Sequence, residues 1–168
     1  ARKRVLNCAK QYQQNLLHKK LLIIFRERQD NSIRFIEIIF HERNYQHLTG
    51  LELTNTEGKI LQHQSKNFYR KCIENKLGLN DVDKVMGGVN FCLGLSREND
   101  VFVPSSALLE DIKKLTSSPS QVLAIFEIDS ELYSTVKHVA KGLNLHHLIL
   151  PPEISSKISL EHYVYRGK

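Results

Sequence analysis

Hydrophobic residues in the first forty positions change from helical spacing to strand spacing. From Val5 to Leu17 they recur every three or four positions, with lysine and glutamine between them, which predicts an amphipathic helix. Two short runs rich in β-branched and aromatic residues follow, Leu21–Phe25 and Ile33–Phe40, and each has the length of a strand. The polar segment Gln29–Ser32 between them is typical of a turn. We therefore expect a helix followed by an antiparallel hairpin.

The pattern predicts shorter elements in the rest of the chain. A short extended piece is expected at Leu51–Asn55, and an amphipathic helix at Ser65–Leu77 with a strongly basic face. The later elements are predicted in this order: a helical turn at Asn80–Val85, a hairpin of Val89–Leu95 and Val101–Val103 closed by Pro104, a short helix capped by Ser105 or Ser106, a strand at Val122–Ile128, a helix at Leu132–Lys141, an apolar run at His147–Leu150 and an edge strand reaching Val164.

Length and cysteine content limit the class of protein. A chain of 168 residues is expected to form one domain, residues 1–168, with a core that needs no disulfides. Its three cysteines, Cys8, Cys72 and Cys92, lie far apart, which favours reduced thiols and a cytoplasmic location. No apolar run has the length of a membrane-spanning helix, so no membrane partner is expected. The start at Ala1, without methionine, is interpreted as a trimmed or processed end.

The charge balance favours an anionic partner. The chain carries 24 lysine and arginine residues against 18 aspartate and glutamate residues, a formal net charge of +6, which places nucleic acid first among such partners. Neither GxxxxGK[ST] nor GxGxxG occurs, so a glycine loop for nucleotide phosphates is not supported. His41-Glu42 starts like a zincin motif, but the next histidine is His47, at a spacing that fits no shared metal ion. We expect neither metal nor cofactor.

The segment Phe40–Gly50 holds the candidate chemistry. It is expected to be a loop fixed to the end of a strand, a place where binding and catalytic groups concentrate. His47 supplies a side chain of the type that titrates near neutrality, and Thr49 supplies a hydroxyl. A histidine and a threonine in a loop are more often surface or capping groups. The same two side chains also suit a metal-free ribonuclease, because such an enzyme takes its nucleophile, the ribose 2′-hydroxyl, from the RNA.

Several blocks of sequence resemble one known family of nucleases. They are Asn44-Tyr45-Gln46-His47-Leu48-Thr49-Gly50, Phe68-Tyr69-Arg70-Lys71-Cys72 with Lys76-Leu77, Cys92-Leu93-Gly94-Leu95 leading to Val101-Phe102-Val103-Pro104-Ser105-Ser106-Ala107-Leu108, and Val122-Leu123-Ala124-Ile125-Phe126. In this order they resemble the fourth group of the phage-encoded Barnase–EndoU–colicin–RelE-like nucleases. Tyr45 stands where phenylalanine is commoner in that family. The resemblance covers about residues 5–130 and leaves 131–168 as a C-terminal extension to which it assigns no role.

The resemblance implies an α+β fold, with helices packed on one side of a central antiparallel sheet and the active site on its open face. It also implies RNA cleavage by a toxin module of phage or mobile elements, delivered by phage or secreted, and a cognate immunity protein or antitoxin as a partner.

Our first hypothesis is a metal-independent endoribonuclease that cleaves RNA through the 2′-hydroxyl. His47 is its general base or acid, and Thr49 orients the phosphate or His47. The remaining predicted residues are Tyr69 and Ser105 in catalysis, and Lys66, Arg70 and Lys71 in substrate binding. Each has a structural alternative. Tyr69 would only pack, Ser105 would cap a helix, and the basic side chains would form a solvated helix face.

Two other functions stay open at this point. A non-catalytic module would bind nucleic acid or protein with the same basic face. An ADP-ribosyltransferase-like enzyme would use His47 and Thr49 on a nicotinamide ribose, although the chain lacks an Arg…Ser-Thr-Ser…Glu-x-Glu series.

Overall fold

The chain forms two compact units, each assembled from segments that are distant in sequence. The structure, a computed structural model, describes residues 2–49, 51–53, 60–63, 82–129, 131–160 and 164–165. Unit 1 comprises Ala1–Lys19 and Ile39–Leu115, and unit 2 comprises Lys20–Ile38 and Thr116–Lys168. The two units are described separately below.

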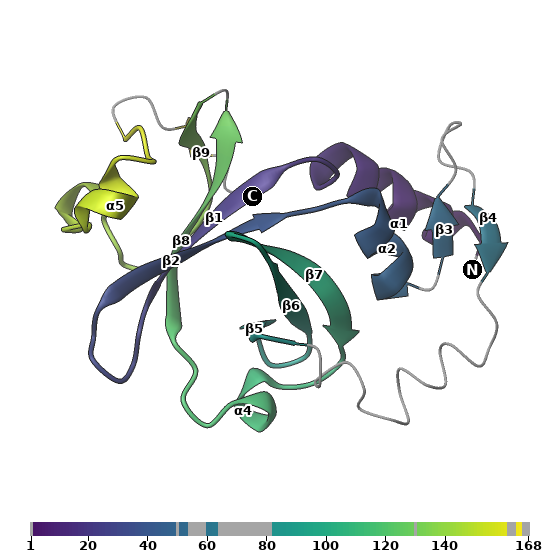
Figure 1. Ribbon diagram of the computed structural model, residues 1–168, viewed down its shortest axis with the longest axis horizontal. Helices are drawn as coiled ribbons and strands as arrows, with labels where there is room; N and C mark the ends of the chain where they lie inside the picture. The colour runs from purple at the N-terminus through teal and green to yellow at the C-terminus, as the bar shows by residue number, and fades with distance from the viewer. Residues whose placement is uncertain are drawn as a thin grey trace. The chain divides into compact units, whose positions relative to one another are not determined.

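Unit 1 combines helices with short strands (Figure 1). Its described elements are α1 (Arg2–Asn15), α2 (Glu42–Thr49), β3 (Leu51–Leu53), β4 (Ile60–His63), β5 (Lys84–Gly87), β6 (Cys92–Glu98), β7 (Val101–Leu108) and α4 (Ile112–Leu115). The helix α1 confirms the prediction from Val5–Leu17, and β3, which pairs antiparallel with β4, confirms the extended piece after residue 50. The helix predicted at Ser65–Leu77 lies outside the described residues.

In unit 1, β6 pairs antiparallel with both β5 and β7. The turn between β6 and β7 is the pair Asn99-Asp100, and Asn99 adopts a left-handed conformation with φ of 54°. Contrary to the prediction, Pro104 does not close β7. It pairs with Leu95 next to a register shift, and a proline is tolerated beside such an irregularity because the ladder is already interrupted there. The helical turn predicted at Asn80–Val85 is also wrong in its described part, residues 82–85, because β5 begins at Lys84 and pairs along β6.

Unit 2 is built on one sheet. Its elements are β1 (Lys20–Arg26), β2 (Ile33–Ile39, whose last residue belongs to unit 1), β8 (Gln121–Asp129), β9 (Leu132–Val139), the 3-10 helix η2 (Leu145–His147), α5 (Pro152–Ser155) and β10 (Val164–Tyr165). Its strands lie in the order β2-β1-β8-β9-β10. The hairpin of β1 and β2, the strand β8 and the edge strand β10 confirm the sequence predictions.

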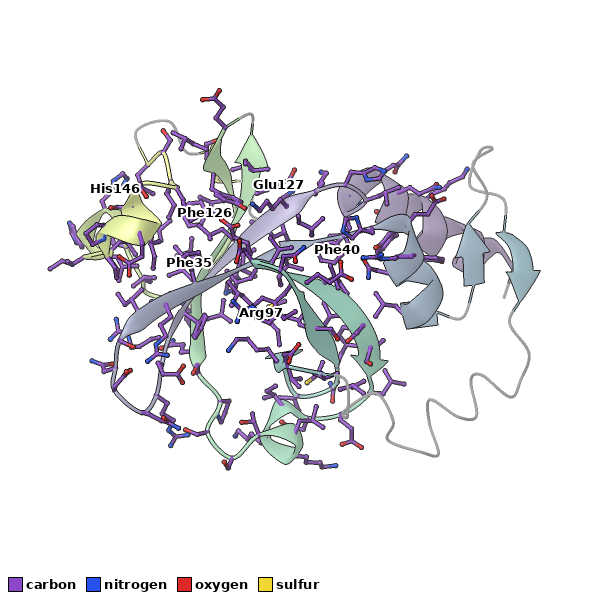
Figure 2. The ribbon with its side chains drawn as sticks, in the orientation of Figure 1. Phe35, Phe40, Arg97, Phe126, Glu127 and His146 are labelled. Carbon is purple, nitrogen blue, oxygen red and sulfur yellow. The ribbon has the colours of Figure 1, made fainter. Side chains whose placement is uncertain are left out.

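The core of unit 2 joins the sheet to the C-terminal segment. Leu22 on β1 is paired in register with Phe126 on β8, and both side chains are fully buried. Val136 on β9 and Ile154 on α5 are buried in the same cluster. Figure 2 shows Phe126 on the side of the sheet toward α5. Residues beyond 130, which the sequence leaves without a role, therefore supply part of this core.

The α+β class predicted from the sequence is confirmed. Helices and strands occur along the whole described chain, and the strand pairings with a described register are antiparallel except for the short parallel pairing of β10 with β9.

The helix predicted at Leu132–Lys141 is wrong, because this segment forms β9. Tyr133 and Val136, its buried residues, are three positions apart, which imitates helical spacing. In the structure they face Ile128 and Phe126 on β8, and the register shifts between Glu127 and Ile128. Because an irregularity of this kind changes which side chains share a face, both residues reach the core although strict alternation would separate them.

Unit 2 also buries one carboxylate. Glu37 on β2 has a side chain that is 9% exposed, and its two oxygens accept hydrogen bonds at 2.8 Å from Lys20 and from Lys157. Burial by itself raises the pKa of Glu37, but the two lysines outweigh it and the net pKa is lowered. Lys157 also lies 5.4 Å from the ring centre of Phe35. These contacts hold the chain after α5 against β2.

We expect the stability of the protein to depend on the ionisation of Glu37. Its pKa is lower in the folded state, so its contribution is complete above the unfolded value of about 4.3 and is lost as pH falls through the folded value. Thermal unfolding of Glu37→Gln and wild type, measured from about pH 3 to pH 7, should therefore show a difference in Tm that is largest at neutral pH and shrinks in acid. Glu153→Gln, at an exposed position on α5, is the control and should show little difference. A pH-independent difference for Glu37→Gln would contradict this expectation.

Candidate functional site

The predicted loop Phe40–Gly50 is mostly a helix, α2, and the loop prediction is wrong. His41 precedes the first turn, and its carbonyl accepts a hydrogen bond from the Asn44 N–H at 3.1 Å. In return the Asn44 Oδ1 accepts the His41 N–H at 2.7 Å. A side chain in the first turn that reaches back to the residue before the helix is half of a capping box, here made by asparagine instead of glutamate or glutamine. Glu42 adds an acidic side chain to the first turn, where the helix dipole favours it.

An aromatic cluster supports the start of α2 from α1. The hydroxyl of Tyr12 donates a hydrogen bond of 2.8 Å to the carbonyl of His41. Its ring lies 5.0 Å from the Tyr45 ring and 6.2 Å from the Phe40 ring, measured between centroids, and Figure 2 shows Phe40 beside the two helices. Burial raises the pKa of Tyr12 to about 12, so its hydroxyl stays protonated and keeps donating at neutral pH. Tyr12 and Tyr45 therefore have a structural role, which is to stabilise the start of α2.

Asn44 also connects α2 to the sheet of unit 1. Its Nδ2 donates a buried hydrogen bond of 2.8 Å to the carbonyl of Pro104 on β7. Asn44 is 3% exposed, and its amide uses the acceptor for His41 and the donor for Pro104. A buried amide satisfied on both sides fixes both partners, because losing either bond leaves a polar group without compensation.

A second link between α2 and the sheet lies at the surface. The guanidinium of Arg43 donates to both carboxylate oxygens of Glu98, the last residue of β6, at 2.6 Å to Oε1 and 2.5 Å to Oε2. Both side chains are about half exposed, so the pair is worth at most about 1 kcal/mol. The buried amide of Asn44 is therefore the stronger of these two links between α2 and the sheet.

The structure places three of the seven predicted site residues. His47 and Thr49 belong to the last turn of α2, and their side chains lie outside the described residues. Ser105 lies within β7 and follows Pro104 directly, so the helix-capping alternative for Ser105 is wrong. Its hydroxyl donates to the Gly94 carbonyl at 3.3 Å. Lys66, Tyr69, Arg70 and Lys71 lie outside the described residues.

The backbone arrangement thus brings together the segment that carries His47 and Thr49 and the strand that carries Ser105. Asn44 was part of the sequence block quoted above, but only the structure gives it a role. The signal in the sequence was an asparagine three positions after His41, which fits a first-turn cap. Tyr12 had no such signal, because a tyrosine on the apolar stripe of a helix is expected only to pack.

Other reactive groups of the described chain do not form a competing site. Cys92 is buried, its thiol lies 3.3 Å from the Glu110 carbonyl oxygen, and burial raises its pKa, which disfavours the reactive thiolate. In the part of the chain that the structure describes, no three metal-ligand side chains are grouped, and no helix is long and apolar enough to cross a membrane.

Unit 2 contains an open pocket of about 650 Å³ beside the turn between β1 and β2. Asp30 and Arg34 line it and pair with each other at 2.9 Å, and hydrogen bonds from Ser32 are the main cause that lowers the pKa of Asp30 to about 2. Ser105, the predicted site residue whose side chain the structure describes, is not among the residues that line this pocket.

Comparison with known proteins gives one match. The family model described as phage-Barnase-EndoU-ColicinE5/D-RelE like nuclease4 matches residues 4–88, which is about half of the chain. The matched range covers α1, α2 and β5 and includes the block that begins at Asn44, whereas β7 with Ser105 lies beyond its end. No curated protein and no solved structure matches the chain.

Proposed function

Because the chain belongs to the family of phage-Barnase-EndoU-ColicinE5/D-RelE like nucleases 4, we propose that it is a metal-independent endoribonuclease. The observation that carries the proposal is the family match, which includes the block from Asn44 to Gly50. It is supported by the hydrogen bond that holds this block, as the helix α2, against β7. The basic composition of the chain fits an RNA substrate, because phosphate contacts dominate affinity for nucleic acid.

The proposed reaction is a transfer within the RNA. The 2′-oxygen of the ribose attacks the neighbouring phosphorus, the bond from phosphorus to the 5′-oxygen breaks, and a 2′,3′-cyclic phosphate forms. His47 takes the proton from the 2′-hydroxyl or gives a proton to the leaving 5′-oxygen. Thr49 orients the phosphate or the imidazole, and Ser105 adds a hydrogen bond.

Four residues outside the described part of the chain complete the proposal. Tyr69 contributes to catalysis, and Lys66, Arg70 and Lys71 supply positive charge to the phosphates and to the charge that develops in the transition state. Residues 1–168 act together as one nuclease-like domain. A cognate immunity protein or antitoxin is the proposed protein partner, and the cytoplasm is the proposed site of action.

Incubation of the purified protein with total RNA in excess EDTA tests the proposal. We expect cleavage to continue in EDTA and to leave 2′,3′-cyclic phosphate or 3′-phosphate ends, because the nucleophile comes from the substrate and not from a metal-bound water. The ends are identified by their response to phosphatase and to ligation.

Three results would contradict the proposal. Activity that stops in EDTA and returns with a divalent cation would indicate a metal-dependent nuclease. RNA that is bound but stays intact would indicate a binding module. Consumption of NAD with modification of a target would indicate an ADP-ribosyltransferase-like enzyme.

A further inference from the structure

Asn44 makes a buried side-chain link between α2 and β7. Its Oδ1 accepts the N–H of His41, and its Nδ2 donates to the carbonyl of Pro104. These two partners come from different elements, and the two bonds require an acceptor on one side of the amide and a donor on the other. Among side chains of this size, an amide supplies the acceptor and the donor on two separate atoms at neutral pH.

The positions that Asn44 joins are close to the proposed catalytic residues along the chain. His47 lies three residues after Asn44 on the same helix, and Ser105 directly follows Pro104 on the same strand. Three residues of a helix rise about 4.5 Å, and one residue of a strand rises about 3.3 Å. The link therefore lies within one helical turn of position 47 and within one residue of position 105. A shift of α2 along β7 would therefore move position 47 relative to position 105 by nearly the same amount.

We propose that Asn44 is a positioning residue of the ribonuclease site, whose amide sets the register of α2 on β7 and thereby the placement of His47 against Ser105. The inference rests on the proposed function. Asn44 does not touch the substrate, and it acts through the helix that it holds. Misplacement of a reacting group by about 1 Å costs up to about a hundredfold in rate, so loss of this link should reduce turnover more than substrate binding.

Two substitutions at this position separate the two bonds of the amide. In Asn44→Asp, the carboxylate still accepts the His41 N–H but cannot donate to Pro104. When protonated, the same carboxyl has an O–H that donates to the Pro104 carbonyl. The His41 N–H favours the charged form of this new carboxyl, whereas burial and the facing Pro104 carbonyl favour the neutral form, so we expect the protonated form to gain population toward the acid end of the accessible pH range. In Asn44→Ser, the hydroxyl is too short to reach Pro104 at any pH.

The experiment measures kcat, KM and unfolding temperature for wild type and both variants between about pH 5 and pH 8. At pH 8 we expect Asn44→Asp to lower kcat by about tenfold to a hundredfold, with KM changed less than about threefold. The ratio of its kcat to the wild-type value should rise as pH falls, whereas the ratio for Asn44→Ser should stay low. Taking ratios to wild type cancels the contributions of neighbouring side chains that all three proteins share, among them His41, Arg43 and Glu98.

Tyr12→Phe is the matched control. It removes a hydrogen bond of the same length from the same turn of α2, the bond to the His41 carbonyl, but leaves the link to β7 intact. We expect it to lower the unfolding temperature while kcat stays within about twofold of wild type. If Asn44→Ser does not fold at pH 8, the change in the kcat ratio of Asn44→Asp between pH 8 and low pH still tests the inference. If Asn44→Asp does not fold, the kcat ratio of Asn44→Ser tests it.

The outcomes distinguish the inference from the proposed function. Wild type that does not cleave RNA overturns both. An active wild type with an equally active Asn44→Asp and Asn44→Ser overturns the inference alone. It is also overturned if Tyr12→Phe loses as much kcat as the Asn44 variants, or if the kcat ratio of Asn44→Asp does not recover in acid, because the loss would then follow stability and not register.

Discussion

Replacement of His47 with alanine is expected to abolish detectable RNA cleavage. A histidine that transfers a proton in the rate-limiting step contributes about a hundredfold to ten-thousandfold in rate, equivalent to roughly 3 to 5 kcal/mol of barrier. RNA affinity should stay within a few-fold, because a neutral imidazole adds little to the attraction of phosphates. The measurements are single-turnover cleavage of a labelled RNA and its equilibrium binding by the same protein preparations.

Two controls make the result specific. His147→Ala makes the same change at an exposed histidine of η2 and should cleave at the wild-type rate. An RNA with 2′-deoxyribose at the cleaved nucleotide should resist wild type completely, because the attacking oxygen is missing. Cleavage by His47→Ala at the rate of His147→Ala would remove His47 from the mechanism, and cleavage of the 2′-deoxy substrate would exclude attack by the 2′-hydroxyl.

Replacement of Phe126 with alanine should produce the largest loss of stability among single substitutions in unit 2. Phe126 is the largest fully buried side chain among the described residues, and it packs in the cluster that includes Leu22, Val136 and Ile154. Removal of a buried phenylalanine ring costs about 3 to 5 kcal/mol, since burial is lost and a cavity is left. The change should appear as a lower midpoint in urea unfolding, with little change in slope.

Phe91→Ala is the control for this prediction. Phe91 belongs to unit 1 and is 49% exposed, so the same substitution should cost no more than about 1 kcal/mol. Equal losses for the two variants would contradict the packing described for unit 2. The shape of the transition tests the single-domain expectation as well. One cooperative transition that shifts as a whole in Phe126→Ala would support it, and two transitions of which only one shifts would contradict it.

Sequence patterns predicted elements well where local and tertiary preferences agree. The helix α1, the hairpin of β1 and β2 and the strand β8 all follow from periodicity and turn residues within a few positions. In the hairpin turn, Asn31 adopts φ of 58°, a conformation that asparagine tolerates better than most residues. Family membership also followed from sequence, because a short block of residue types in fixed order is visible without any coordinates.

Predictions failed where pairing with a neighbouring strand decided the conformation. The segment that begins at Leu132 has helical spacing of its buried residues, but it lies along β8 and takes the conformation that satisfies that strand. Pro104 and Ser105 have the residue types of a strand end and a helix cap, yet β7 continues through them because β6 offers a partner as far as Leu108. Strand pairing is a non-local preference, and a single sequence does not display it.

For the candidate site, the sequence by itself determined which residue types are present and that they form a family block around His47. The tertiary structure decided that this block is a helix, that Asn44 and Tyr12 hold its first turn, and that β7 lies against it. The physical reason is the distance along the chain between the partners. Asn44 and Pro104 are 60 positions apart, and a hydrogen bond between a side chain and a distant carbonyl leaves no periodic trace in the sequence. Only folding brings that donor and acceptor together. Once they are buried, each needs the other as a partner, because an unpaired buried polar group costs free energy.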